Sequence, residues 1–239
     1  MYQLCYYANK NTHHCLNSKN MSDQKEKHFK NRRQAGERLG KFLEPKYRSL
    51  KPVVLGIPLG GIEVGYYVSI ALEAEFSAII SKKLPYPGNE KLAFGAASEQ
   101  GESYITAMGI NTLSADVISK VVEGQFEEVE QRVKLYRKDT TLPNLRGRVV
   151  IIVDDCVASG STIVPLISLC RKLNAAQVVL ATPIAGHNLD PNLNKADALE
   201  VLVQHPFFHS LDQAYEKSHI DHHKIMLMLN PVYQAQPRF

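Results

Sequence analysis

Two adjacent carboxylates, Asp154 and Asp155, stand between an apolar run, Val149–Val153, and a loop of small and hydroxylated residues, Ala158–Thr162. Backbone N–H groups in such a loop can point into one concavity, and the positive end of the following helix dipole adds to their attraction for an anion. The loop therefore suits a phosphate group. The acids would repel phosphate but would accept hydrogen bonds from vicinal hydroxyls. A sugar phosphate with free 2′ and 3′ hydroxyls satisfies both halves of this stretch.

The loop differs from two common phosphate-binding motifs. No lysine follows Gly160, so the loop is not the GxxxxGK[ST] motif of P-loop proteins. Its glycines do not fall as GxGxxG, which excludes the dinucleotide-binding fingerprint. Gly160 still allows the backbone to approach a ligand closely and to adopt a positive φ angle.

Apolar strand patterns alternate with helical patterns along the chain, which predicts an α/β fold with a doubly wound, mainly parallel sheet. Expected strands lie at 53–55, 76–80, 149–153, 177–181 and 198–203. Expected helices lie at 23–43, 61–73, 113–138, 163–172, 190–196, 210–216 and 221–229, with Pro45 and Pro52 bracketing the loop after the first helix. Ligands of such sheets bind beyond the carboxyl ends of the strands, so the acid pair should stand at that edge.

The segment 84–101 is rich in proline and glycine. Such a stretch in a compact domain is usually a mobile or functional loop, and a hairpin inside it is an open alternative.

Composition narrows the class of protein. No apolar run approaches the roughly 18 residues of a membrane span, and the first residues have no secretory h-region. The four cysteines show no disulfide framework, which indicates a cytoplasmic protein.

Charge is spread unevenly along the chain. Residues 1–51 hold 12 Lys/Arg and 4 Asp/Glu, a local charge of +8, whereas the remaining residues hold 16 Lys/Arg and 20 Asp/Glu, a charge of −4. A basic arm could contact nucleic acid, but a solvated helix face is the favoured interpretation.

The stretch around the acid pair resembles the phosphoribosyl pyrophosphate (PRPP) signature of the type I phosphoribosyltransferases. The matching residues read Val150-Ile151-Ile152-Val153-Asp154-Asp155-x-x-Ala158-Ser159-Gly160-Ser161-Thr162. In that family the acid pair binds the ribose hydroxyls and the loop binds the 5′-phosphate. The resemblance implies that Asp154 and Asp155 receive the diol. It assigns the phosphate to Ala158, Ser159, Gly160, Ser161 and Thr162.

Three further motifs are similar to a bacterial subgroup of stand-alone phosphoribosyltransferase domains. They are Phe29-x-Asn31-Arg32-x-Gln34-Ala35-Gly36, Leu55-Gly56-Ile57-Pro58-x-Gly60-Gly61 and Lys83-Leu84-x-x-Pro87-Gly88-x-x-x-Leu92-Ala93-x-Gly95-Ala96. The resemblance implies a phosphoribosyltransferase domain over 23–239, with its core at about 50–205 and a small C-terminal hood at about 203–216. The segment 84–101 then takes the place of the family's flexible loop. Residues 1–22 are expected to be a disordered extension.

The resemblance implies a reaction in which ribose 5-phosphate passes from PRPP to a nitrogenous base, with release of pyrophosphate. Mg²⁺ would be delivered mainly with PRPP, so no protein metal ligands are assigned. The expected partners are these small molecules and a second copy of the chain in a homodimer, with no membrane and no nucleic acid. The alternative is a non-catalytic PRPP- or nucleotide-binding regulator on the same fold.

The segment 56–61 matches the family's pyrophosphate loop and assigns Leu59, Gly60 and Gly61 to the diphosphate. Leu59 stands where the family has a basic residue. Lys82 and Lys83 could compensate, and Lys83 joins the acid pair among the catalytic candidates. Phe207 of the hood could stack on the base, although packing of Phe207 or Phe208 in the core is an equally open interpretation.

Overall fold

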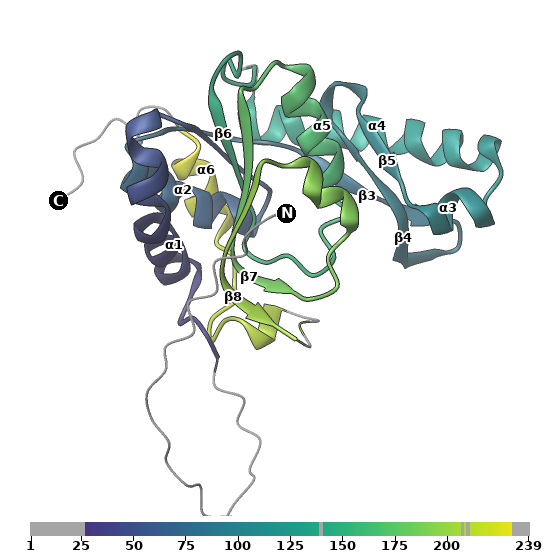
Figure 1. Ribbon diagram of the computed structural model, residues 1–239. Coiled ribbons are helices and arrows are strands. Elements are labelled where there is room, and N and C mark those ends of the chain that lie inside the picture. Colours follow the sequence, from purple (N-terminus) through teal and green to yellow (C-terminus); the bar gives the residue numbers. More distant parts are fainter. Residues whose placement is uncertain (1–26, 139–140, 207, 209–210, 231–239) are drawn as a thin grey trace, which may run out of the picture.

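The protein was described from a computed structural model, which defines residues 27–138, 141–206, 208 and 211–230. At its centre lies a five-stranded parallel sheet with the order β2-β1-β6-β7-β8 (Figure 1). The strands are β1 (Val53–Gly56), β2 (Glu75–Ala78), β6 (Val149–Val153), β7 (Gln177–Gly186) and β8 (Ala198–His205). The parallel α/β architecture expected from the sequence is therefore confirmed.

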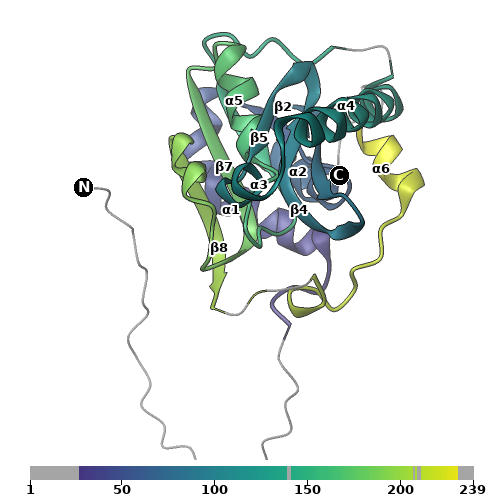
Figure 2. The same cartoon turned by 90° about the vertical axis from the view of Figure 1, so that its right-hand side faces the viewer.

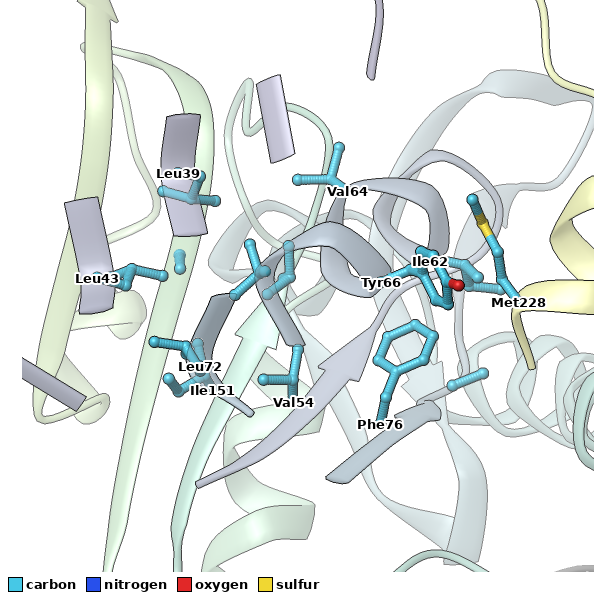
Figure 3. Packing of buried hydrophobic residues seen from close by; sticks show 14 of the residues in the cluster. Leu39, Leu43, Val54, Ile62, Val64, Tyr66, Leu72, Phe76, Ile151 and Met228 are labelled. Carbon is cyan, nitrogen blue, oxygen red and sulfur yellow. The ribbon is translucent and has the colours of Figure 1, made fainter. Parts of the chain in front are cut away.

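Helices cover both faces of this sheet because successive strand residues point to opposite sides. Val54 and Ile151 face one hydrophobic cluster, and Leu55 and Ile152 face another. The first face is covered by α1 (Arg32–Tyr47), α2 (Gly60–Leu72) and α6 (His222–Met228), and the second by α5 (Val164–Lys172) (Figure 1). Figure 3 shows the first cluster, with side chains of α1 and α2 packed over the strands.

Helix α1 lies unusually close to α2, and two glycines make this possible. A Cβ atom at Gly36 would lie 2.7 Å from the carbonyl oxygen of Val64, and one at Gly40 would lie 2.7 Å from the Cβ of Ala71. Side chains at these two positions would push the helices apart. The close packing fixes the start of α1, and therefore Arg32, relative to α2.

The boundaries of α1 differ from the expected 23–43. The helix begins after Asn31, whose side chain caps it by accepting a hydrogen bond from the Gln34 N–H at 2.9 Å. It continues to Tyr47, so the prediction that Pro45 ends it was wrong. Pro45 lies in the last turn, so the backbone hydrogen bond that it cannot donate is one of the last in the helix. Positions 23–26 of the expected helix lie outside the described residues.

A second, antiparallel sheet has the order β3-β4-β5. It comprises β3 (Ser81–Tyr86), β4 (Asn89–Ser98) and β5 (Ser103–Ile105), followed by α3 (Ala107–Thr112) and α4 (Ala115–Arg137). Most of the segment 84–101 thus forms a hairpin rather than an irregular loop. Its turn holds Gly88 with φ +75°, and Leu84 and Phe94 bury its inner face against α4. Figure 2 views this part of the molecule with α3 and α4 toward the viewer.

The remaining segments depart from expectation in length or type. Strand β7 runs five residues beyond the expected end at 181, because every residue from Val178 to Gly186 is buried. Short 3-10 helices, Pro191–Lys195 and Leu211–Gln213, stand where helices were expected. Further 3-10 turns occupy Arg48–Leu50 and Glu99–Gly101. Within the described ranges, no helix is long and apolar enough to span a membrane.

Candidate functional site

The acid pair lies where the order of the parallel strands reverses. Strands β1 and β6 are neighbours, with Gly56 in register with Val153, and β2 and β7 continue the sheet in opposite directions. Ligands bind in the crevice at such a switch point. The N–H of Ile57 donates to the Val153 carbonyl at 2.9 Å, so the loop after β1 and the acids after β6 leave the sheet side by side.

Gly60 and Gly61 lie directly against the acid pair. A Cβ atom at Gly60 would fall 1.8 Å from Oδ2 of Asp155, and one at Gly61 would fall 2.5 Å from the Val153 carbonyl oxygen. The peptide bond before this turn, between Pro58 and Leu59, is cis. The structure therefore brings the expected pyrophosphate loop and the expected ribose acids into one site.

Asp155 is held by charged and polar groups from both ends of the described chain. Arg32 Nε donates to its Oδ2 at 2.7 Å, and Arg32 Nη1 donates to the Ser218 carbonyl at 2.6 Å. The Tyr215 hydroxyl donates to the Asp155 carbonyl at 2.7 Å, and the guanidinium lies 5.4 Å from the Tyr215 ring centre. Only 10% of the Asp155 side chain is exposed, so its carboxylate is buried, paired and fixed in orientation.

Asp154 has a different environment from Asp155. Burial raises the pKa of Asp154 well above its ordinary value, and the negative charge of Asp155 raises it further. The Asp155 N–H donates to Asp154 Oδ1 at 2.9 Å, and this bond and the charge of Arg32 act in the opposite direction. The two acids are therefore unequal, since Asp155 has a cation as direct partner and Asp154 has none.

The loop expected to bind phosphate connects β6 to α5. Val157 pairs with Ala185 of β7, which extends the ladder into the loop. Gly160 has φ +79°, and a Cβ atom there would lie 2.5 Å from Leu193 Cδ1, so a glycine is needed for two reasons. Ala158 and Ser159 are exposed, whereas Ser161 and Thr162 are half-buried. The exposed part of the loop leads into the N-terminus of α5, whose Ile163 cap supplies no side-chain acceptor.

A side-chain cluster on the far side of this loop was not expected from the sequence. The Tyr104 hydroxyl of β5 donates to Asp190 Oδ2 at 2.8 Å and accepts from Asn192 Nδ2 at 3.0 Å. The Asp190 N–H donates to the Ser159 carbonyl at 2.8 Å. Burial alone would raise the pKa of Asp190, but hydrogen bonds from Asn192 and Tyr104 outweigh it and lower that pKa. The second sheet is thus tied to the loop through Asp190.

The two expected lysines and Leu59 have different surroundings in the structure. Lys82 faces α4 and pairs with Glu128, and burial, followed by the charge of Arg132, lowers its pKa. Alternation along β3 turns Lys82 toward α4, and its expected role at the diphosphate stays a prediction. Lys83 is exposed on the other face of the strand, and its catalytic role stays a prediction. Leu59 is half-buried against the cluster under α2.

The hood is built from both ends of the described chain. Phe29 forms a parallel bridge with Tyr215, with its N–H donating to the Ala214 carbonyl at 2.9 Å. Phe208 is buried beside these two rings, which supports core packing rather than stacking on a ligand. Phe207 lies outside the described residues. The participation of the segment around Phe29 was missed, although it belongs to the motif that contains Arg32.

Four basic side chains of the described part of the N-terminal region are paired with acids. Its ion pairs join Arg32 to Asp155, Arg33 to Glu37, Lys46 to Glu200, and Arg48 to Glu44 and Glu73. Among the residues that the structure defines, no group of three or more His, Cys, Asp or Glu side chains could hold a metal ion.

Comparison with known proteins agrees with this geometry. The sequence profile of the family described as "Phosphoribosyl transferase domain" matches residues 23–210. A provisionally named phosphoribosyl transferase of Mycobacterium tuberculosis, found in strains CDC 1551 and H37Rv, is 31% identical over 190 residues, which cover 78% of this chain and 43% of the relative. The chain therefore spans less than half the length of those relatives. The crystal structure of the protein TT1426 from Thermus thermophilus superposes with a TM-score of 0.71 at 27% identity, covering 84% of this chain and 97% of that one.

Proposed function

Because the chain belongs to the phosphoribosyl transferase domain family, we propose that it transfers ribose 5-phosphate from PRPP to a nitrogenous base and releases pyrophosphate. One observation carries this proposal. The acid pair, the glycines Gly60 and Gly61, and the loop Ala158–Thr162 all leave the carboxyl edge of one parallel sheet at its switch point. A ribose with a phosphate on one side and a diphosphate on the other needs these three elements together.

Each element has a chemical task in this proposal. The N–H groups and hydroxyls of Ala158–Thr162 bind the 5′-phosphate, and Asp154 and Asp155 face the ribose hydroxyls. The backbone at Gly60 and Gly61 approaches the diphosphate, because neither residue carries a side chain. The transition state has positive charge on the ribose, which nearby carboxylates stabilise. Catalysis then rests on positioning and electrostatics rather than on a covalent intermediate.

The few acidic side chains at the site fit a magnesium ion that enters with the substrate. Mg²⁺ keeps several waters and binds substrate phosphates through few protein ligands. When bound, it supplies positive charge to the departing diphosphate. The chain's own residues hold and orient the ribose and its 5′-phosphate.

A non-catalytic PRPP- or nucleotide-binding regulator is the second candidate. Leu59 supports it, because the position that would supply a cation to the diphosphate instead packs against an apolar cluster. A site with the ribose acids and the phosphate loop but without that cation would bind PRPP and release pyrophosphate slowly. In either case we propose a cytoplasmic protein that acts as a homodimer on small molecules.

The experiment that separates the candidates uses the full chain with PRPP, Mg²⁺ and a panel of purine and pyrimidine bases. Pyrophosphate release with one base, abolished in Asp154→Asn and retained in Asp116→Asn, supports the transferase. Asp116 is a suitable control because it lies exposed in the first turn of α4. PRPP binding in calorimetry without release for any base supports the regulator. Absence of PRPP binding contradicts the transferase and a regulator that binds PRPP.

A further inference from the structure

Arg32 is the least exposed charged residue of the site. Only 1% of it is accessible, and it lies at the first position of α1, against Asp155, Tyr215 and the Ser218 carbonyl. A buried guanidinium is costly unless its charge is paired, and Asp155 is the partner. The residue therefore joins the N-terminal helix, the acid pair and the C-terminal segment through one ion pair.

We propose that Arg32 is a positioning residue that fixes Asp155 as its counter-ion and leaves Asp154 as the carboxylate that receives the ribose diol. This inference rests on the proposed function, because it assigns unequal tasks to the two acids of the PRPP site. It also differs from the equal roles that the sequence motif implies for Asp154 and Asp155.

The packing around Asp155 supports this division. Its Oδ2 accepts from Arg32 Nε at 2.7 Å and would lie 1.8 Å from a Cβ atom at Gly60. That oxygen is therefore enclosed by the guanidinium and the Gly60 backbone. Arg32 Nη2, which shares a guanidinium edge with Nε, is buried and has no hydrogen-bond partner within the described ranges. Asp155 Oδ2 thus receives one of the two donors on that edge.

The electrostatics of the two acids also supports this division of roles. Asp154 and Asp155 are adjacent, and the cation of Arg32 opposes the rise in the pKa of Asp154. The other titratable groups in contact are Cys156 and Tyr215. Burial, followed by the charge of Asp155, raises the pKa of both, so they are neutral near pH 7. Arg32 is therefore the cation among these groups that opposes the rise in the pKa of Asp154.

The first test measures the acids in the absence of any ligand. The carboxyl carbons of Asp154 and Asp155 are followed by ¹³C NMR over a pH titration in wild-type protein and in Arg32→Met, Arg32→Lys and Arg33→Gln. Loss of the cation in Arg32→Met should move the titration of Asp154 to higher pH, whereas Arg32→Lys should restore it in part. Arg33→Gln is the matched control, because Arg33 is the next residue of the same helix and pairs with Glu37 on the surface. An unchanged titration in Arg32→Met overturns the proposal.

The second test measures PRPP binding by calorimetry in the same variants. Arg32→Lys keeps the charge but loses the planar fork, so we expect PRPP affinity to fall about ten- to a hundredfold, with Arg33→Gln unchanged. Wild-type affinity in Arg32→Lys, with the fold intact by circular dichroism, contradicts the positioning role. Failure of the wild-type protein to bind PRPP contradicts the proposed function, and the ligand-free titration still tests the hold of Arg32 on the acids.

A pair of variants at the acids distinguishes their tasks even where Arg32→Met does not fold. Asp155→Asn leaves the buried Arg32 without a counter-ion, so its melting temperature should fall. Asp154→Asn removes an acid that has no direct cationic partner, so PRPP binding should be lost without a fall in melting temperature. Equal effects of the two substitutions on both readouts overturn the division of roles.

Discussion

Gly60 and Asp155 are in such close contact that an alanine at position 60 would place its Cβ atom 1.8 Å from Asp155 Oδ2 and 2.6 Å from Arg32 Nε. Neither neighbour can move easily, because each is buried and bound to the other. We expect Gly60→Ala to lower the melting temperature and to abolish PRPP binding. Thermal unfolding by circular dichroism and calorimetry with PRPP measure the two effects.

Gly124→Ala is the control for that substitution. Gly124 lies inside α4, and a Cβ atom there would meet nothing within 4 Å. Alanine is about 0.5–1 kcal/mol more favourable than glycine in a helix, so the melting temperature should rise slightly and PRPP binding should stay unchanged. If Gly60→Ala lowers the melting temperature by no more than Gly124→Ala changes it, the close contact between Gly60 and Asp155 is contradicted.

Asp154→Asn should make the protein more stable at neutral pH while weakening its binding of PRPP. The folded state raises the pKa of Asp154 through burial and through the charge of Asp155, so ionising this acid at pH 7 costs folding free energy. The cost is absent below the unfolded pKa of about 3.9 and grows as the pH rises toward the folded value. Asparagine removes the cost and can keep the hydrogen bond from the Asp155 N–H.

The measurement is the melting temperature of both proteins across the pH range. A gain of about 1 kcal/mol would raise the melting temperature by about 2–4 °C for a chain of this size. The gain should be present at pH 7 and should shrink as the pH approaches about 4. A variant that is less stable than wild type at pH 7 would show that Asp154 is not held against its ionisation.

Glu99→Gln should strongly destabilise the protein, because Glu99 and Arg137 form a buried ion pair whose side chains are each 5% exposed. Glu99 Oε1 accepts from the Ile80 N–H at 3.0 Å and from Arg137 Nη1 at 2.7 Å, so the pair fastens α4 to the segment after β2. Removing one partner of such a pair costs about 3–5 kcal/mol. Urea unfolding of Glu99→Gln measures this loss.

An exposed ion pair gives the matched comparison. Arg33 Nε lies 2.8 Å from Glu37 Oε1, and their side chains are 64% and 50% exposed. Glu37→Gln should therefore change the free energy of unfolding by at most about 1 kcal/mol. Similar losses in Glu99→Gln and Glu37→Gln would mean that burial does not govern the energetics of the Arg137 pair.

Tyr104→Phe tests whether the second sheet positions the phosphate loop. The substitution removes the hydroxyl that joins Asn192 to Asp190, whose N–H in turn holds the Ser159 carbonyl. We expect a loss of about 1 kcal/mol in the free energy of unfolding and a weaker binding of inorganic phosphate and PRPP. Tyr86→Phe is the control, because the Tyr86 hydroxyl contacts only the exposed Thr112 hydroxyl in the described structure. Equal phosphate affinity in both variants would refute the coupling.

The features that the sequence predicted well are local. Alternation of buried strands with helices indicated the parallel sheet, and the glycine and hydroxyl pattern after Asp155 marked a loop that the structure places at the switch point. The resemblance to the family's pyrophosphate loop implied that Gly60 shares a site with the acids, and the structure places it against Asp155. The first two of these inferences need only the period of a strand, the conformational demand of a glycine, or the common edge at which parallel strands end.

The features that it did not predict depend on contacts between distant residues. Arg32 lies 123 residues before Asp155 and 186 residues before Ser218, and no local pattern reveals such partners. The sequence favoured Lys83 over Lys82 as a catalytic candidate but showed no partner for either, whereas alternation along β3 sends Lys82 to Glu128 and leaves Lys83 exposed. A hairpin in the segment 84–101 was left as one of two alternatives, because its prolines and glycines are typical of loops and its stability comes from packing of Leu84 and Phe94 against α4.

The bridge between Phe29 and Tyr215 has a consequence for the order in which the protein matures on the ribosome. Synthesis runs from the N-terminus, so α1 and the acid pair leave the ribosome before the segment that carries Tyr215 and Ser218 exists. A nascent chain that ends before residue 215 lacks two of the contacts that orient Arg32 and Asp155. The last part of the described chain to be made is therefore the part that completes the site, and a chain released early is made without it.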